Sequence, residues 1–382
     1  MRVSSLLAAL ATGSLVAAAP SPKSPKPSTP TGDVNPFEGK TFFVNPKWSA
    51  KLDQTAKAFL KKGDLINWAK TLRVQQISTF VWVSRRSELS NIDDAIAAAR
   101  KAQKLTGRKQ IVGLVLYNLP DRDCSAGESA GELDSTKDGL QLYKDTFVKP
   151  YAEKLAAAKD LTFAVVLEPD SLANLVTNLG VPLCERAADV YREGIAYAIS
   201  SLQFDHVHLY IDAAHGGWLG WDPNLPLAAK EFATVLKLAG EGKKIRGFAT
   251  NVSNYNPFNA LVRENYTEWS NSWDESHYAS SLAPHLEAEG LPAHFIVDQG
   301  RVHLPGAREE WGEWCNVEPA GFGPKPTTNT NNTYVDALVW IKPGGESDGQ
   351  CGMAGAPRAG EWFDEYAQML VKNADKSIFK FW

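Results

Sequence analysis

The sequence lacks the features that typify a nucleic-acid-binding, membrane-binding or metal-binding protein. Its 382 residues contain 40 Lys and Arg against 44 Asp and Glu, a formal net charge of −4, and no basic stripe could neutralise phosphates. A Gly-rich phosphate loop, a Ser–His–Asp order and a His-rich cluster are also missing. We therefore expect no nucleic-acid or membrane partner, no metal and no organic cofactor.

The N-terminus has the pattern of a secretory signal. Met1 and Arg2 precede the apolar segment 3–19, which is too short and too early for a membrane anchor. Pro20 then opens a tract rich in Pro, Ser and Lys that predicts an extended tail. We expect a signal peptide at 1–18, a tail at 19–36 and one catalytic domain at 37–382, in a secreted, extracellular, monomeric protein.

The four cysteines, Cys124, Cys184, Cys315 and Cys351, all lie far beyond this tail, and their spacing does not fit a zinc site. An exported protein with an even cysteine count is expected to form disulfides. Their order favours Cys124 with Cys184 and Cys315 with Cys351, although four cysteines allow three connectivities.

Short apolar runs alternate with helical patterns along the catalytic domain. Seven runs predict strands, at 77–83, 111–117, 163–168, 207–212, 245–250, 294–298 and 337–342. Helical patterns occupy 91–105, 137–159, 185–202, 227–238, 276–289 and 360–372. This alternation predicts an α/β fold with a parallel sheet, closed or nearly closed into a barrel.

Acidic and aromatic residues crowd the segments that follow the predicted strands. The acidic residues are Asp123, Asp170, Asp212, Asp298, Glu346 and Asp348. In such barrels the reactive groups lie at the carboxyl ends of the strands, so these segments predict one shared cleft. Two carboxylic acids suffice to hydrolyse a bond between sugars, and twelve Trp residues offer flat faces for stacking on them.

The Glu-Pro-Asp turn at 168–170 is the strongest catalytic candidate. Asp170 follows a buried apolar run and stands where several carboxylates would raise the pKa of the most desolvated one. The alternative is structural, because Asp before Ser-Leu-Ala-Asn would also serve as a helix N-cap.

The segments VLYNLPDRDC (115–124) and AVVLEPDSLA (164–173) resemble the two signature motifs of glycoside hydrolase family 6, the inverting cellulases. The likeness continues through YIDAAHGGWLGW, RGFATNVSNYN, DQGR, WGEWCNV and KPGGESDG. We expect a single catalytic domain without a cellulose-binding module, because only the signal precedes the Pro-rich tail. The resemblance implies a distorted, seven-stranded, TIM-like barrel with its cleft at the carboxyl ends of the strands.

The resemblance further implies roles for six residues in catalysis. Asp170 would be the general acid, and Asp123 would keep it protonated and receive a proton through water and Ser129. Asp348 matches the carboxylate often proposed as the base, with the route through water to Asp123 as the competing idea. Asp212 would support the site, and Tyr117 would help to distort the sugar ring.

For substrate binding, the resemblance implies a cleft that holds cellulose and cello-oligosaccharides. Trp82 and Trp314 would stack on glucose units on the non-reducing side, and Trp218 and Trp221 on the other side. Sugar hydroxyls would be bound by His215, Asn254, Lys342 and Glu346.

The length of the loops bears on where the enzyme cuts. The first cover loop, from Cys124 to Gly139, looks complete, whereas the second, 350–358, is much shorter than a tunnel-forming version. We therefore expect an endoglucanase, with a cellobiohydrolase that releases cellobiose from non-reducing chain ends as the alternative. A non-catalytic carbohydrate-binding barrel is the alternative of another class, and retention of Asp123 and Asp170 argues against it.

Overall fold

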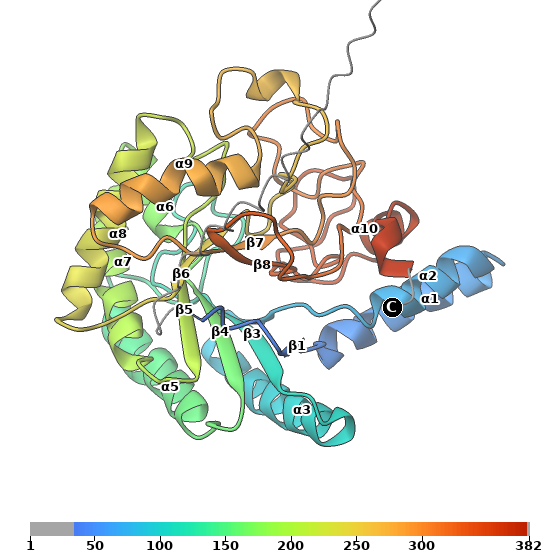
Figure 1. The fold of residues 1–382 in the computed structure, drawn as a ribbon, viewed down its shortest axis with the longest axis horizontal. Helices are drawn as coiled ribbons and strands as arrows, with labels where there is room; N and C mark the ends of the chain where they lie inside the picture. Colours follow the sequence, from blue (N-terminus) through green and yellow to red (C-terminus); the bar gives the residue numbers. More distant parts are fainter. Residues whose placement is uncertain (1–33, 380–382) are drawn as a thin grey trace, which may run out of the picture. The chain divides into compact units, whose positions relative to one another are not determined.

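The structure is a computed structural model and describes residues 34–379 (Figure 1). Its centre is a sheet in which all neighbouring strands run parallel, in the order β1-β3-β4-β5-β6-β7-β8, with β2 also paired to β3. The strands are β1 (Thr41–Phe42), β2 (Val81–Val83), β3 (Gln110–Leu116), β4 (Thr162–Leu167), β5 (Val207–Asp212), β6 (Gly247–Thr250), β7 (Phe295–Asp298) and β8 (Val335–Val339). The seven predicted strands correspond to β2 through β8, and the two-residue β1 was not predicted.

The sheet curls into a distorted barrel that is almost closed. In the described part of the chain, β2 and β8 approach each other without forming a ladder. Instead, the Phe80 N–H donates to the Trp340 carbonyl at 3.0 Å, and the indole N–H of Trp82 donates to the Ile341 carbonyl at 2.9 Å. The prediction of a distorted seven-stranded, TIM-like barrel is confirmed.

Both faces of the sheet are buried, which explains the continuous apolar runs in the sequence. Val115 and Val166 lie opposite each other and point into the barrel, whereas Leu114 and Val165 point outward against the helices. Phe37 also packs in the barrel interior, and the Asn35 side chain donates to the Asp336 carbonyl at 2.7 Å. The packed domain therefore begins at Asn35, two residues before the predicted start at 37. The proposed signal peptide at 1–18 and most of the tail lie outside the described residues.

Helices surround the barrel. They are α1 (Pro46–Lys61), α2 (Leu65–Val74), α3 (Ser90–Thr106), α4 (Gly139–Tyr143), α5 (Lys149–Ala156), α6 (Ser171–Thr177), α7 (Pro182–Ser201), α8 (Asn224–Ala239), α9 (Glu275–Ala288) and α10 (Asp364–Lys372). A π-helical turn, η2 (Lys144–Val148), joins α4 to α5, and single 3₁₀ turns lie at η1 (Arg86–Glu88), η3 (Asn265–Thr267) and η4 (Lys376–Phe379). In Figure 1, α5, α7 and α8 lie on one side of the barrel, and α1, α2 and α10 pack together on another. Among the described residues no helix is long and apolar enough to span a membrane.

Two disulfides fix the loops at the carboxyl edge of the sheet. Cys124 pairs with Cys184 and so ties the segment after β3 to the start of α7. Cys315 pairs with Cys351 and ties the long segment between β7 and β8 to the segment after β8. The predicted pairing is confirmed.

Candidate active site

The residues predicted to act on the substrate follow the carboxyl ends of different parallel strands. Tyr117 follows β3, Asp170 follows β4, and Asp212 ends β5. Lys342 and Asp348 follow β8. Because parallel strands end at the same edge of a sheet, these side chains gather at one end of the barrel.

Asp170 occupies the first turn after β4 and is not used as a helix cap. It stands at the N-cap position of α6, yet its side chain makes no capping hydrogen bond, and its φ is 68°. Burial raises the pKa of the Asp170 carboxyl well above its usual range, and the negative charges of Asp212, Asp123 and Asp348 raise it further. The group is therefore suited to hold a proton and to donate it, which favours the catalytic interpretation over the structural one.

Asp212 supports Asp170 from the neighbouring strand. Its Oδ1 accepts the backbone N–H of Asp170 at 3.0 Å and that of Ala214 at 3.1 Å. Its Oδ2 is buried and has no hydrogen-bond partner among the described residues. Burial raises the pKa of Asp212 to about 7. Asp212 thus fixes the backbone at Asp170 while its second oxygen stays unsatisfied.

Asp123 belongs to a short chain of hydrogen bonds. Its Oδ2 accepts the backbone N–H of Ser129 at 2.7 Å and the Ser129 hydroxyl at 3.1 Å. The Ser129 hydroxyl also lies 2.8 Å from the Tyr117 hydroxyl. Arg122 covers the Tyr117 ring at 4.3 Å, and Trp82 meets the same ring edge-on at 5.4 Å. The arrangement joins three of the predicted catalytic side chains into one network.

Asp348 is buried between two cations. Its carboxylate lies 2.7 Å from the Arg301 guanidinium and 3.2 Å from the Lys342 ammonium. It also accepts the Tyr255 hydroxyl at 3.2 Å and the Asn316 N–H at 2.9 Å. Burial alone would raise the pKa of Asp348, but Arg301 and Lys342 outweigh burial and hold the pKa below its usual range. This carboxylate is a weak proton acceptor.

The four predicted stacking residues, Trp82, Trp314, Trp218 and Trp221, are all partly exposed. The indole N–H groups of Trp218 and Trp221 donate to the Thr177 hydroxyl at 2.7 Å and to the Gly217 carbonyl at 3.0 Å. Protein groups thus hold the polar edges of these rings and fix their orientation, as a stacking platform requires.

The four residues predicted to bind sugar hydroxyls have different surroundings. Lys342 faces Asp348, and the Asn254 side-chain oxygen accepts a hydrogen bond from the Arg308 guanidinium at 2.8 Å. Burial, together with the positive charge of Arg308, lowers the pKa of His215 to about 3, so its ring is neutral. Glu346 is ion-paired with Lys51 of α1 at 2.7 Å. A sugar hydroxyl would share that carboxylate with Lys51.

Two acidic residues at strand ends are used by the protein itself. Asp298 accepts four backbone N–H groups, from Ser253, Gly300, Ile341 and Lys342, at 2.9 to 3.2 Å. Glu168 accepts the N–H groups of Asn118 and Leu119 at 3.0 and 3.2 Å. Glu168 therefore positions the segment that leads to Asp123. Neither carboxylate is free for substrate.

Sequence reasoning missed the buried arginines of the site. Arg301 pairs with Asp348, and Arg122 donates to the Ser129 carbonyl at 2.8 Å and covers Tyr117. Both arginines lie in quoted motifs, DQGR and PDRDC. Their positions inside these acidic motifs were the available signal in the sequence.

Several residues that follow the carboxyl ends of the strands have left-handed backbone conformations. Glu168, Asp170, Ala214, Asn251 and Ser253 have φ between 48° and 68°. This region is unfavourable for residues with a side chain, and such strain concentrates at functional sites.

Glu275, at the start of α9, stabilises the segment that carries Trp218 and Trp221. Its Oε1 accepts the Gly216 N–H at 2.9 Å and the Asn256 side chain at 2.7 Å. Burial raises its pKa from 4.5 to about 7. Because the folded protein keeps this proton to a higher pH than the unfolded chain, the resulting stability is present below pH 4.5 and is lost as pH rises through about 7.

The free energy of unfolding of the parent should fall as pH rises from roughly 4 to 8, because Glu275 ionises. In Glu275→Gln, which has no proton to lose at this position, we expect that fall to be smaller by about 3 kcal/mol. Urea unfolding at several pH values measures this difference. If both proteins show parallel pH profiles, Glu275 does not carry the effect.

The two cover loops contact each other. Glu128, in the loop after β3, accepts the backbone N–H of Gln350, in the segment after β8, at 3.0 Å. A side chain on Gly349 would collide with the Glu128 carboxylate. The short 350–358 segment is therefore bridged to the first loop, which its length did not indicate.

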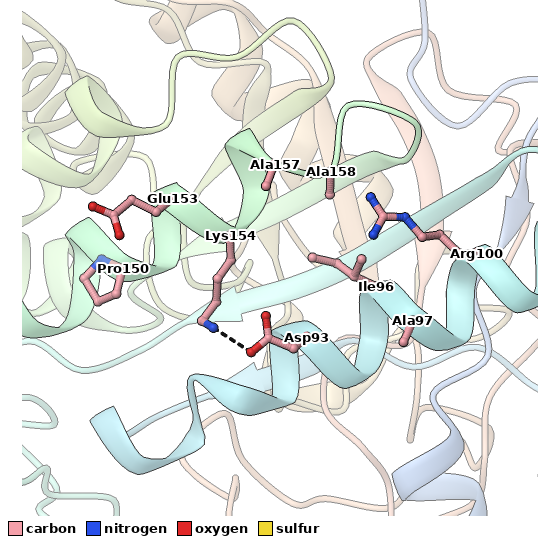
Figure 2. A pocket seen from close by; sticks show the side chains of 9 residues that line it. All are labelled: Asp93, Ile96, Ala97, Arg100, Pro150, Glu153, Lys154, Ala157 and Ala158. Atoms are coloured by element: carbon pink, nitrogen blue, oxygen red, sulfur yellow. Dashed lines mark hydrogen bonds and ion pairs between the residues drawn. The ribbon is translucent and has the colours of Figure 1, made fainter.

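A surface hollow between α3 and α5 lies apart from this site. Asp93, Arg100, Glu153 and Lys154 line it, together with apolar residues (Figure 2). Asp93 and Lys154 form an ion pair across it, and none of the residues at the carboxyl ends of the strands takes part. This hollow is not the active site.

Comparison with known proteins places these observations in one family. The family model described as glycosyl hydrolases family 6 matches residues 37–374. The 1,4-beta-D-glucan cellobiohydrolase CEL6B of Podospora anserina is 74% identical, over 100% of this chain and 92% of that protein. Endoglucanase-6B of Humicola insolens is 57% identical, over 90% of this chain and 99% of that protein.

Solved structures of related proteins support the same family assignment. Endoglucanase CEL6B from Humicola insolens superimposes with a TM-score of 0.88 at 57% identity, over 90% of this chain and 100% of that one. Cellobiohydrolase II (CEL6A) from Humicola insolens, in complex with glucose and cellotetraose, gives a TM-score of 0.85 at 39% identity, over 89% and 99%.

Proposed function

Because this chain belongs to glycosyl hydrolase family 6 and is a cellulase of that family, we propose that Asp170 protonates the oxygen between two glucose units. The raised pKa of Asp170 supports this role, since burial favours the protonated form that a general acid needs. As the bond between the anomeric carbon and that oxygen breaks, water attacks the opposite face of the sugar. The configuration inverts and no covalent sugar intermediate forms.

We assign the proton of the attacking water to Asp123, through Ser129 and an intervening water. The hydrogen bond from the Ser129 hydroxyl to Asp123, beside Tyr117, supports this route. Asp348 is the weaker candidate, because Arg301 and Lys342 already neutralise its charge. After one cycle Asp123 carries the proton taken from water, and Asp170 has lost the proton given to the leaving oxygen. Proton exchange with solvent returns both carboxyl groups to their starting states.

We propose that glucose units bind along Trp82 and Trp314 on one side of the cleaved bond and along Trp218 and Trp221 on the other. All four rings are partly exposed, which stacking on sugar requires. The solved relative from Humicola insolens that contains glucose and cellotetraose supports cello-oligosaccharides as ligands. The two disulfides support secretion into an oxidising compartment.

We propose cellobiohydrolase action, the alternative that the sequence left open, over the endoglucanase first expected. The observation that carries this choice is the contact between Glu128 and Gln350, which bridges the two cover loops. Loops that are joined over the cleft favour entry of a cellulose chain by its end. The 74% identical relative is also named a cellobiohydrolase. Endoglucanase action remains the second candidate, because the 350–358 segment is short and a 57% identical relative is named an endoglucanase.

Glu128→Ala tests this proposal because it removes the contact between the loops. A solvent-exposed hydrogen bond contributes about 0.5 to 1.5 kcal/mol, so we expect thinning of carboxymethylcellulose to rise about twofold to tenfold relative to cellobiose release from amorphous cellulose. Gln350→Ala is the matched control, since Gln350 donates through its backbone. A parent enzyme that thins carboxymethylcellulose rapidly with little early cellobiose would instead be an endoglucanase.

A further inference from the structure

The segment between β6 and α9 carries a tryptophan that the active site does not use. Trp269 is 83% exposed, although tryptophan is one of the more buried residue types in folded proteins. Leu261 and Val262 in the same segment are 98% and 70% exposed. Exposed large apolar side chains on a rigid segment are typical of a binding surface.

The backbone around Trp269 is held in place. The Arg263 guanidinium donates to the carbonyls of Thr267 at 2.8 Å, of Glu268, and of Ser270 at 2.7 Å. These carbonyls lie on both sides of Trp269 in the sequence, and the first of them ends the single turn η3. A ring presented on a fixed backbone loses little conformational entropy when it binds a ligand.

The same segment packs against the one that carries Trp218 and Trp221. The Asn271 side chain donates to the Asp222 carboxylate at 2.9 Å, one residue beyond Trp221. Side chains on Gly216 or Gly220 would collide with Ser272, so the two segments are in close contact. The gold segment before α9 in Figure 1 is therefore in direct contact with the segment that carries Trp218 and Trp221.

Aromatic contacts reinforce this connection. Tyr266 meets the Trp311 ring edge-on at 5.2 Å. Trp311 in turn lies against Gly217 and is 6.3 Å from the His215 ring. The turn that presents Trp269 is thus fixed to the proposed sugar-binding segment on two sides.

We propose that Trp269 is an outlying platform on which a β-1,4-linked glucan chain stacks beyond the cleft, on the side of Trp221. The inference rests on the proposed role of Trp218 and Trp221 as glucose-stacking residues. A flat indole face suits the apolar face of a glucose ring, and neutral glucan needs no charged partner. Such a platform contacts a long chain or a cellulose surface more than a short oligosaccharide that fills only the cleft.

The experiment compares Trp269→Ala with the parent on amorphous cellulose and on cellotetraose. One aromatic contact contributes about 0.5 to 1.5 kcal/mol, so we expect binding to amorphous cellulose to weaken about threefold to tenfold. The ratio of activity on amorphous cellulose to activity on cellotetraose falls by a similar factor. Trp269→Phe retains much of both values, and Leu105→Ala, which removes an exposed apolar side chain of α3, matches the parent.

Asn265-Tyr266-Thr267 is a glycosylation sequon, so a glycan is a competing partner for the ring. If Trp269→Ala and Asn265→Gln both lower the melting temperature while cellulose binding and the activity ratio stay at parental values, the ring covers a glycan and the platform is wrong. Unchanged binding and activity ratio in Trp269→Ala without any thermal effect also overturn it. If the parent does not hydrolyse cellotetraose but Trp269→Ala weakens cellulose binding, the platform stands and the proposed function fails.

Discussion

Replacing Asp170 by Asn reduces the rate of cellotetraose hydrolysis by about 10²-fold to 10⁴-fold, because the amide cannot donate the proton that the leaving oxygen needs. Proton NMR of the reaction measures this rate and also the configuration of the first product. We expect the parent to release the α-anomer first, as inversion of a β-linked chain requires.

The control for this variant is Asp160→Asn, which changes an exposed aspartate that pairs with Arg100 before the amino end of β4, at the opposite end of the strand from Asp170. It should hydrolyse cellotetraose at the parental rate. A similar rate in Asp170→Asn and the parent would remove Asp170 from the role of acid. The β-anomer as first product would overturn the inverting mechanism.

Replacing Arg301 by Met lowers the free energy of unfolding by about 3 to 5 kcal/mol, because it leaves a buried carboxylate without its main partner. Arg301 and Asp348 lie 2.7 Å apart, and both side chains are almost completely buried. Lys342, at 3.2 Å, compensates only part of the remaining charge. Urea unfolding measures the loss.

The double variant Arg301→Met with Asp348→Asn is the informative comparison, since it removes both charges. We expect it to recover about half of the lost stability or more. Arg100→Met, which breaks a well-formed but exposed pair with Asp160, should cost only about 1 kcal/mol or less. A single Arg301→Met variant no less stable than Arg100→Met would show that the buried pair contributes little.

Much of the barrel was predictable because of how its strands are buried. Strands β3 and β4 are covered on both faces, so they appear in the sequence as unbroken apolar runs. Helix α1 was missed, although Asn45 before Pro46 is a start signal and the Asn45 side chain does accept the Trp48 N–H. Its apolar positions, separated by lysines, pack against α10 in a second core away from the barrel.

The site was predictable in outline and not in its electrostatics. Asp170 and Asp298 both follow strands, but four backbone N–H groups occupy the Asp298 carboxylate. The partner that depresses the pKa of Asp348 is Arg301, 47 residues away in the chain. Loop length likewise did not indicate that Glu128 would reach Gln350. These are long-range contacts, which local pattern does not encode.

The left-handed backbone at the strand exits restricts how this enzyme can diversify. Left-handed φ values at Asp170, Asn251 and Ser253 disfavour β-branched replacements at these positions. We therefore expect substitutions that alter specificity to be better tolerated in the outer segments, such as those that carry Glu128 and Trp269. Asp170, Asn251 and Ser253 should therefore tolerate few replacements, for conformational reasons as well as chemical ones.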